Sequence, residues 1–89
     1  MTTMFVRHTV TNYKAWRKVY DDFAPVQKAK GVTAQAVYQA ADNPNDITVT
    51  HDFATVEAPH AFVNSEELKS AMQNAGVVGA PTIWLTNKV

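Results

Sequence analysis

The stretches MFVRHTV at residues 4–10 and ITVTHDF at residues 47–53 decide the fold of this chain. In both, apolar and polar side chains alternate, which is the pattern of a β-strand with one buried face. Each stretch also carries one histidine, His8 or His51, in its apolar row. A titratable ring in such a row is either a satisfied core residue or the polar wall of a ligand pocket. The two histidines therefore indicate where on the sheet a ligand pocket would lie, but they do not identify a reaction.

The segment between these two strands predicts a helix and a further strand. After residues 11–12, which can cap a helix, apolar side chains recur every three or four positions over residues 13–23, as in an amphipathic helix. Pro25 must kink or restart that helix, because it cannot donate the next backbone hydrogen bond. A strand is expected at 33–40, and the turn-forming residues 42–46 favour a hairpin into the second histidine-bearing strand.

The last third of the chain repeats the order of helix and strand. Thr55 can cap a second helix, residues 64–65 resemble a fresh helix start, and residues 82–87 predict a last strand after a loop at 77–81. We therefore predict one α+β domain, residues 1–89, with the ferredoxin-like order β-α-β-β-α-β. It would have a four-stranded antiparallel sheet in the order 4-1-3-2, with two helices on one face.

The composition is that of a globular protein and excludes several functional classes. Hydrophobic residues make up 46% of the 89 residues and charged residues 18%, which argues against disorder. Eight basic residues balance eight acidic ones, so the basic surface expected of a nucleic-acid binder is missing. The absence of cysteine excludes disulfides and thiolate metal sites. Without a signal-peptide pattern or a membrane-spanning run, we expect a cytoplasmic protein that does not bind membranes.

The two faces of the predicted sheet differ in character. The face under the helices is assigned the mainly apolar row Val6, His8, Val10, Ile47, Val49, His51, Phe53, Ile83 and Leu85. The helix-free face is assigned Phe5, Val37 and Trp84 among polar residues, so that Tyr38 falls on the helix side. A solvated face seldom needs a tryptophan, whereas interfaces often use one as an anchor. We therefore expect a homodimer that forms through the helix-free sheet face.

Four short segments resemble a known superfamily: FVRH at 5–8, YKAW at 13–16, the Ala24-Pro25 step, and MQNAGVVGAP at 72–81. With them the chain is similar to the dimeric α/β-barrel superfamily, in particular to antibiotic-biosynthesis-monooxygenase-like and small cyclase-like proteins. The resemblance implies a dimer with facing sheets and one small-molecule pocket per subunit. Members include cofactor-free oxygenases of polycyclic phenols, polyketide cyclases and haem-degrading proteins. The Asn, Trp and His set of the haem-degrading members has no match here, so no cofactor is expected.

His8 and His51 are the candidate catalytic residues. An offset of about three residues, or roughly 10 Å, would suit them to flank a bound ring and would be too long for one shared metal ion. With an ordinary pKa near 6.5, either could move a proton at neutral pH. Otherwise each is a buried neutral histidine bonded to the backbone or to a tyrosine. The candidate substrate contacts, which could equally fill the core, are aromatic residues: Trp16, Tyr20, Phe23, Tyr38 and Phe62. No metal-ligand spacing is present, so no metal is expected.

Two functions stay open. In the first, the protein is a cofactor-independent monooxygenase-like or cyclase-like enzyme that acts on an aromatic or polyketide-like small molecule. A pocket histidine would then take a phenolic or α-carbonyl proton, and the apolar walls would hold the substrate away from water. In the second, the protein is a non-catalytic small-ligand binder or a stress-associated dimer. The lack of a dense charged cluster favours the second hypothesis, and the two histidines favour the first.

Overall fold

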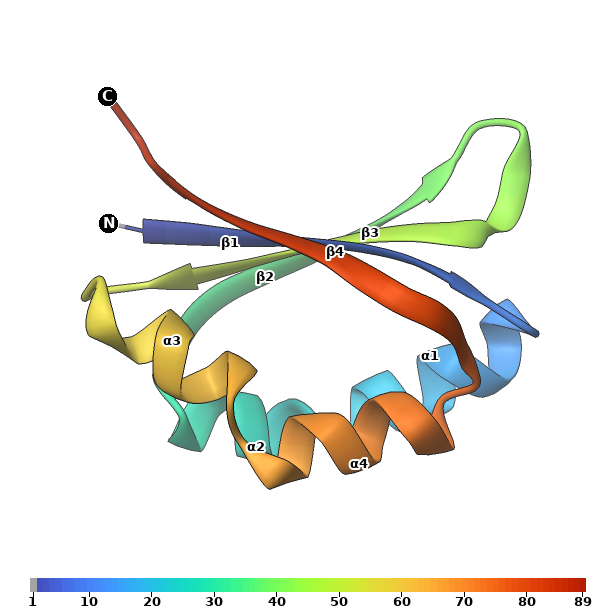
Figure 1. Ribbon diagram of the computed structural model, residues 1–89, viewed down its shortest axis with the longest axis horizontal. Coiled ribbons are helices and arrows are strands. Elements are labelled where there is room, and N and C mark those ends of the chain that lie inside the picture. The colour runs from blue at the N-terminus through green and yellow to red at the C-terminus, as the bar shows by residue number, and fades with distance from the viewer. Residues whose placement is uncertain (1) are drawn as a thin grey trace.

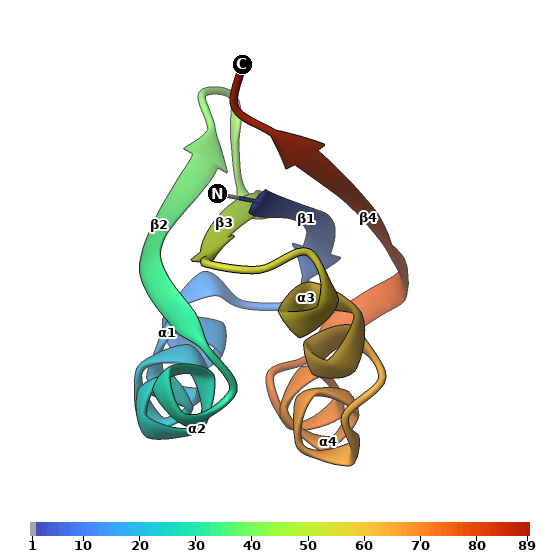
Figure 2. The same cartoon turned by 90° about the vertical axis from the view of Figure 1, so that its left-hand side faces the viewer.

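The computed structural model describes residues 2–89 (Figure 1). Its elements are, in chain order, β1 (Thr2–Val10), α1 (Tyr13–Asp22), α2 (Ala24–Ala29), β2 (Val32–Ala40), β3 (Asn43–Phe53), α3 (Glu57–Val63), α4 (Glu66–Asn74) and β4 (Val77–Asn87). The four strands form one antiparallel sheet in the order β2-β3-β1-β4. This arrangement confirms the predicted α+β ferredoxin-like fold and strand order. All four helices lie on the same face of the sheet (Figure 2). Within this helical layer, α1 and α2 form one half and α3 and α4 form the other half (Figure 2).

Each of the two predicted helices is divided into two. Asn12 caps α1 by accepting a hydrogen bond from the backbone of Ala15 at 3.1 Å, and that helix ends before Pro25, which occupies the first turn of α2. The second division falls between α3 and α4, where the Ser65 hydroxyl accepts from the Leu68 backbone at 3.2 Å. Pro25 and the Ser65 cap therefore mark the positions at which one helix ends and the next begins.

The last strand is longer than predicted. Residues 77–81, expected to be a loop, already belong to β4, and they pair irregularly with β1. The register shifts between Arg7 and Thr9, where Thr82 and Val78 are the respective partners. Gly79 adopts a φ of +71° within this irregular stretch. Because β4 is an edge strand, it can accommodate both a bulge and Pro81.

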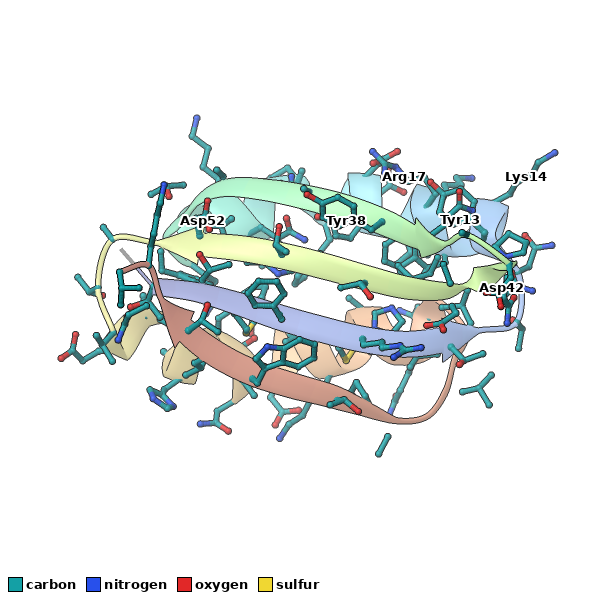
Figure 3. All side chains as sticks on the ribbon, turned by 90° about the horizontal axis from the view of Figure 1, so that it is seen from above. Tyr13, Lys14, Arg17, Tyr38, Asp42 and Asp52 are labelled. Carbon is teal, nitrogen blue, oxygen red and sulfur yellow. The ribbon has the colours of Figure 1, made fainter. Side chains whose placement is uncertain are left out.

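The predicted assignment of the two faces is right for three strands and wrong for β2. Val32 pairs with Phe53 but Ala34 pairs with Asp52, so β2 has one extra residue at Thr33. This bulge exchanges the faces of the residues that follow it, because side chains alternate along a strand. Val37 therefore pairs with the buried Val49 on the helix side. Tyr38 lies on the helix-free face and is 58% exposed (Figure 3).

The core under the sheet has two clusters. The first joins Met4, Val6, Phe53, Phe62 and Leu68, and the second joins Val10, Trp16, Ile47, Val49 and Ala75. His8 and His51 are buried in the same layer, one near each end of the central strands β1 and β3. None of the four helices in residues 2–89 has the length and apolar character that a membrane crossing demands.

Candidate functional site

A pocket lies where the two core clusters meet, between the central strands and the helices. Its residues come from β1, β3, α1, α2, α3 and α4: Met4, Val6, His8, Trp16, Val19, Tyr20, Phe23, Gln27, Val49, His51, Phe62, Leu68, Ala71, Met72 and Ala75. No charged side chain is among these lining residues, all of which belong to the described range 2–89. The cavity volume is about 50 Å³, which is enough for ordered water but smaller than the 150 Å³ cavity that accepts benzene in another protein.

One row of aromatic rings connects the two histidines. The ring centroids of His8 and Trp16 are 5.7 Å apart, and those of the stacked Trp16 and Tyr20 are 4.8 Å apart. Tyr20 lies 6.3 Å from His51, which in turn lies 5.4 Å from Phe62. The spacing of four between Trp16 and Tyr20 places both rings on one face of α1, towards the sheet. The pocket wall is therefore a continuous aromatic surface with an imidazole at two points.

The histidines are farther apart than predicted. Met4 pairs with His51 and His8 pairs with Ile47, so four residues of β1 separate the two positions. At about 3.3 Å per residue this corresponds to ~13 Å along the strand, against the ~10 Å expected from aligned strand midpoints. One register step accounts for the difference. In residues 2–89 no group of three His, Cys, Asp or Glu side chains is arranged to hold a metal ion.

Three polar side chains in the pocket lack hydrogen-bond partners. Both ring nitrogens of His8, both of His51 and the Oε1 atom of Gln27 are buried without a partner anywhere in residues 2–89. The three residues are 7%, 4% and 2% exposed, respectively. Most buried polar groups in proteins are paired, because an unpaired one costs about 1–3 kcal/mol. Three such groups around one apolar cavity therefore indicate a place where a polar molecule can be bound.

Burial controls the protonation of the titratable groups. Desolvation lowers the pKa of His51 to about 4, against a weaker opposing effect of the Asp52 charge. Desolvation also lowers the pKa of His8, and the nearby Asp46 carboxylate opposes this. Asp46 is itself paired with Arg7 at 2.7 Å. Burial raises the pKa of Tyr20 to about 12. At neutral pH the pocket therefore presents two neutral imidazoles and a neutral phenol.

Most of the sequence-predicted residues come together here. His8, His51, Trp16, Tyr20, Phe23 and Phe62 all line the pocket. Tyr38 does not, and its assignment to the pocket is corrected: the bulge in β2 turns it to the opposite face of the sheet. Sequence reasoning missed Gln27. It follows Phe23 by four positions, and a hydrogen bond of 3.1 Å from its backbone to Phe23 continues the helical turn, so helical spacing could have placed both on one face.

No protein-family model and no curated protein sequence matches this chain. Solved structures do match it over almost their whole length. One, from Bordetella bronchiseptica and provisionally assigned as an antibiotic biosynthesis monooxygenase, has a TM-score of 0.84 and 16% identity, covering 99% of this chain and 96% of the other. The fold is that of the antibiotic biosynthesis monooxygenase-like proteins. A protein of the same provisional assignment from Nitrosomonas europaea has a TM-score of 0.79 and 12% identity, with coverage of 100% and 99%.

A third structure carries a described activity. SnoaB, a cofactor-independent oxygenase from Streptomyces nogalater, has a TM-score of 0.76 and 12% identity, covering 99% of this chain and 94% of its own. At this identity the likeness shows the fold. It confirms the ferredoxin-like, monooxygenase-like architecture that the sequence resemblance implied and leaves the reaction to the residues of the pocket.

Proposed function

We propose that this protein is a cofactor-independent monooxygenase-like or cyclase-like enzyme that acts on an aromatic or polyketide-like small molecule in the pocket between sheet and helices. The observation that carries this proposal is the set of three buried, unpartnered polar side chains in an otherwise apolar cavity. The fold shared with SnoaB supports it. A ligand with an apolar ring and polar substituents would complement both the walls and the unpaired atoms.

The proposed role of His51 and His8 is proton transfer. A neutral imidazole can accept a phenolic or α-carbonyl proton, and burial keeps both rings neutral at pH 7. In a monooxygenase the anion formed would be oxidised by O2, so that one oxygen atom stays on the ring carbon as a carbonyl and the other leaves as water with the two hydrogens of that carbon. In a cyclase the anion would attack a carbonyl carbon of the same molecule, and the resulting alkoxide would take the proton back from the imidazolium. Trp16, Tyr20, Phe23 and Phe62 would hold the ring flat against the sheet and exclude water.

The pocket must widen to admit a substrate. A volume of about 50 Å³ is too small for a single ring, so side chains at the helix side have to move. Met72 of α4 is half-buried at the cavity wall, and its unbranched thioether side chain adapts readily to a new shape. We expect a compound with one ring to bind with less rearrangement than a polycyclic one.

The alternative function is a non-catalytic small-ligand-binding or stress-associated dimeric protein. One observation favours it: a pKa of about 4 makes His51 a weak base at neutral pH, whereas a general base works best with a pKa near the operating pH. The same unpartnered nitrogens would then only hold a ligand. Both functions require a small ligand to bind in the pocket, but only the enzyme would convert that ligand into a product.

We also propose that the protein forms a homodimer through its helix-free sheet face. Phe5 and Trp84 stack on this face with centroids 5.2 Å apart, and Trp84 is 42% exposed. Tyr38 on β2 and Val78 on β4, the two edge strands, are further strongly exposed apolar side chains of this face. Exposed aromatic groups of this kind are typical of interface cores.

Oxygen uptake and product analysis with a panel of anthrol-like phenols and poly-β-ketones test the enzymatic proposal. We expect turnover by the natural protein and at least a hundredfold loss in His51→Ala or His8→Ala, since general acid–base catalysis contributes about 10²–10⁴-fold. His60→Ala is the matched control, because His60 is exposed on α3 and does not line the pocket. Turnover that survives both pocket substitutions would contradict the catalytic role. Binding without turnover across the panel would favour the alternative.

A further inference from the structure

Gln27 is the most buried polar side chain of the pocket. It lies on the short helix α2 and is 2% exposed, and its Oε1 atom has no hydrogen-bond partner in the part of the chain that the structure describes. Both neighbouring histidines face the same cavity. The oxygen of a primary amide can only accept hydrogen bonds, so the partner that it lacks must be an O–H or N–H donor.

The Tyr20 hydroxyl is not free to supply the missing donor. Burial is the main influence on this hydroxyl and raises its pKa, while the Gln27 side chain acts in the opposite direction. A phenol has one proton to donate, and the Tyr20 hydroxyl donates it to Gln35 on the edge strand β2. The Oε1 atom of Gln27 therefore remains open to a donor from a ligand.

A buried carbonyl without a donor makes the folded protein less stable than an apolar group of similar shape would. Gln27 is therefore not explained by packing alone. The pocket wall also bears no charged side chain within residues 2–89, so an anionic or cationic ligand would lose its hydration without gaining an ion pair. The complementary ligand is an uncharged ring with a hydroxyl or amine substituent.

We propose that Gln27 is a specificity-determining residue whose Oε1 atom accepts a hydrogen bond from the hydroxyl group of an uncharged ring bound in the pocket. This inference rests on the proposed ligand pocket. It adds a means by which the pocket distinguishes a hydroxylated ring from the same ring without the hydroxyl. The residue is placed to select and position the ligand, and the proton-transfer groups remain the histidines.

Phenol and toluene are a suitable pair of probes, because they have nearly the same shape and differ in one donor. We would measure the dissociation constants of both by titration calorimetry or NMR at pH 7, for the natural protein and for Gln27→Met. The expected result is a three- to tenfold weaker binding of phenol, which corresponds to about one hydrogen bond, with toluene binding unchanged within about twofold. Gln73→Met, the same change at an exposed position of α4, should alter neither constant.

Thermal melting provides a second measurement. Because Gln27→Met removes an unpaired buried carbonyl, we expect the melting temperature to stay the same or rise. Gln27→Leu is a second variant, and we expect it to give the same changes in probe binding and melting temperature as Gln27→Met. A phenol-to-toluene ratio that is unchanged in both variants would overturn the role of Gln27 while leaving the pocket intact. A failure of both variants to fold would show that Gln27 is needed for folding, and this would also overturn its assignment to ligand selection. If the natural protein binds neither probe, the proposed pocket function itself is refuted.

Discussion

Acidification from pH 7 to pH 4 is expected to destabilise the protein through His51. In the folded protein, burial lowers the pKa of this imidazole to about 4, whereas the unfolded chain has the ordinary value near 6.5. Between these two values the unfolded chain binds more protons at this position than the folded one. The free energy of unfolding therefore falls as the pH falls through this window.

The magnitude follows from the two pKa values. Their difference corresponds to a loss of about 2 kcal/mol between pH 7 and pH 5, and of about 3 kcal/mol by pH 4. A domain of this size has a total stability of about 5–15 kcal/mol, so the loss is a large fraction of it. His8, whose pKa burial also lowers, adds a loss of the same sign. The pKa values of the Asp46 and Glu67 carboxyl groups are also lowered in the folded protein, by Arg7 and Lys30 respectively. Their contribution to the free energy of unfolding is lost at a still lower pH, where the folded carboxylates become protonated.

Urea denaturation of the natural protein and of His51→Leu over pH 4 to 7.5 isolates the contribution of this one histidine. At pH 7 the variant should be at least as stable as the natural protein, because it loses two unpartnered nitrogens and keeps the apolar volume. Between pH 7 and pH 4 the difference in favour of the variant should grow by about 3 kcal/mol. A stability difference that does not change with pH would refute the conclusion that His51 is buried and neutral.

Two further predictions concern the helix-free face and the glycines. Trp84→Asp should raise the dimer dissociation constant about 30-fold or more, because it puts an unpaired charge into the interface core. An unchanged mass by light scattering would contradict the proposed interface. Gly76→Ala and Gly79→Ala should each cost about 1–2 kcal/mol, since both residues have positive φ. Gly76→Ala should cost more, as its Cβ would lie 2.7 Å from the Thr11 hydroxyl. Adding Thr11→Ala should remove that difference in urea denaturation.

The fold could be predicted from the sequence because local signals and hydrophobic periodicity agree along most of the chain. Asn12 and Ser65 cap helices, and the alternation in residues 4–10 and 47–53 identifies the two central strands. The extent of β4 could not be predicted. Gly79 and Pro81 indicate a loop locally, yet pairing with β1 holds this stretch in the sheet through a bulge. Backbone hydrogen bonds to a distant strand outweighed local preference there.

The candidate site could be predicted where it depends on the alternation within β1 and β3 and on the periodicity of α1. His8, His51, Trp16 and Tyr20 were placed on the right face for that reason. The wrong face of Tyr38 has a different origin, since a single bulged residue is not visible in an alternating pattern that is weak to begin with. The spacing between the histidines depended on a register that no single strand encodes.

The bulge at Thr33 also makes this edge of the sheet tolerant of a change of one codon in the gene. Deleting that residue would join Val32 directly to Ala34, and both could keep their present partners Phe53 and Asp52 in a regular ladder. Tyr38 would therefore stay on the helix-free face, and Gln35, which accepts the hydrogen bond of Tyr20, would stay on the helix side. A homologue that lacks this residue would carry the same cavity wall on a β2 strand without a bulge. The length of the chain can therefore change here without a change in the lining of the pocket.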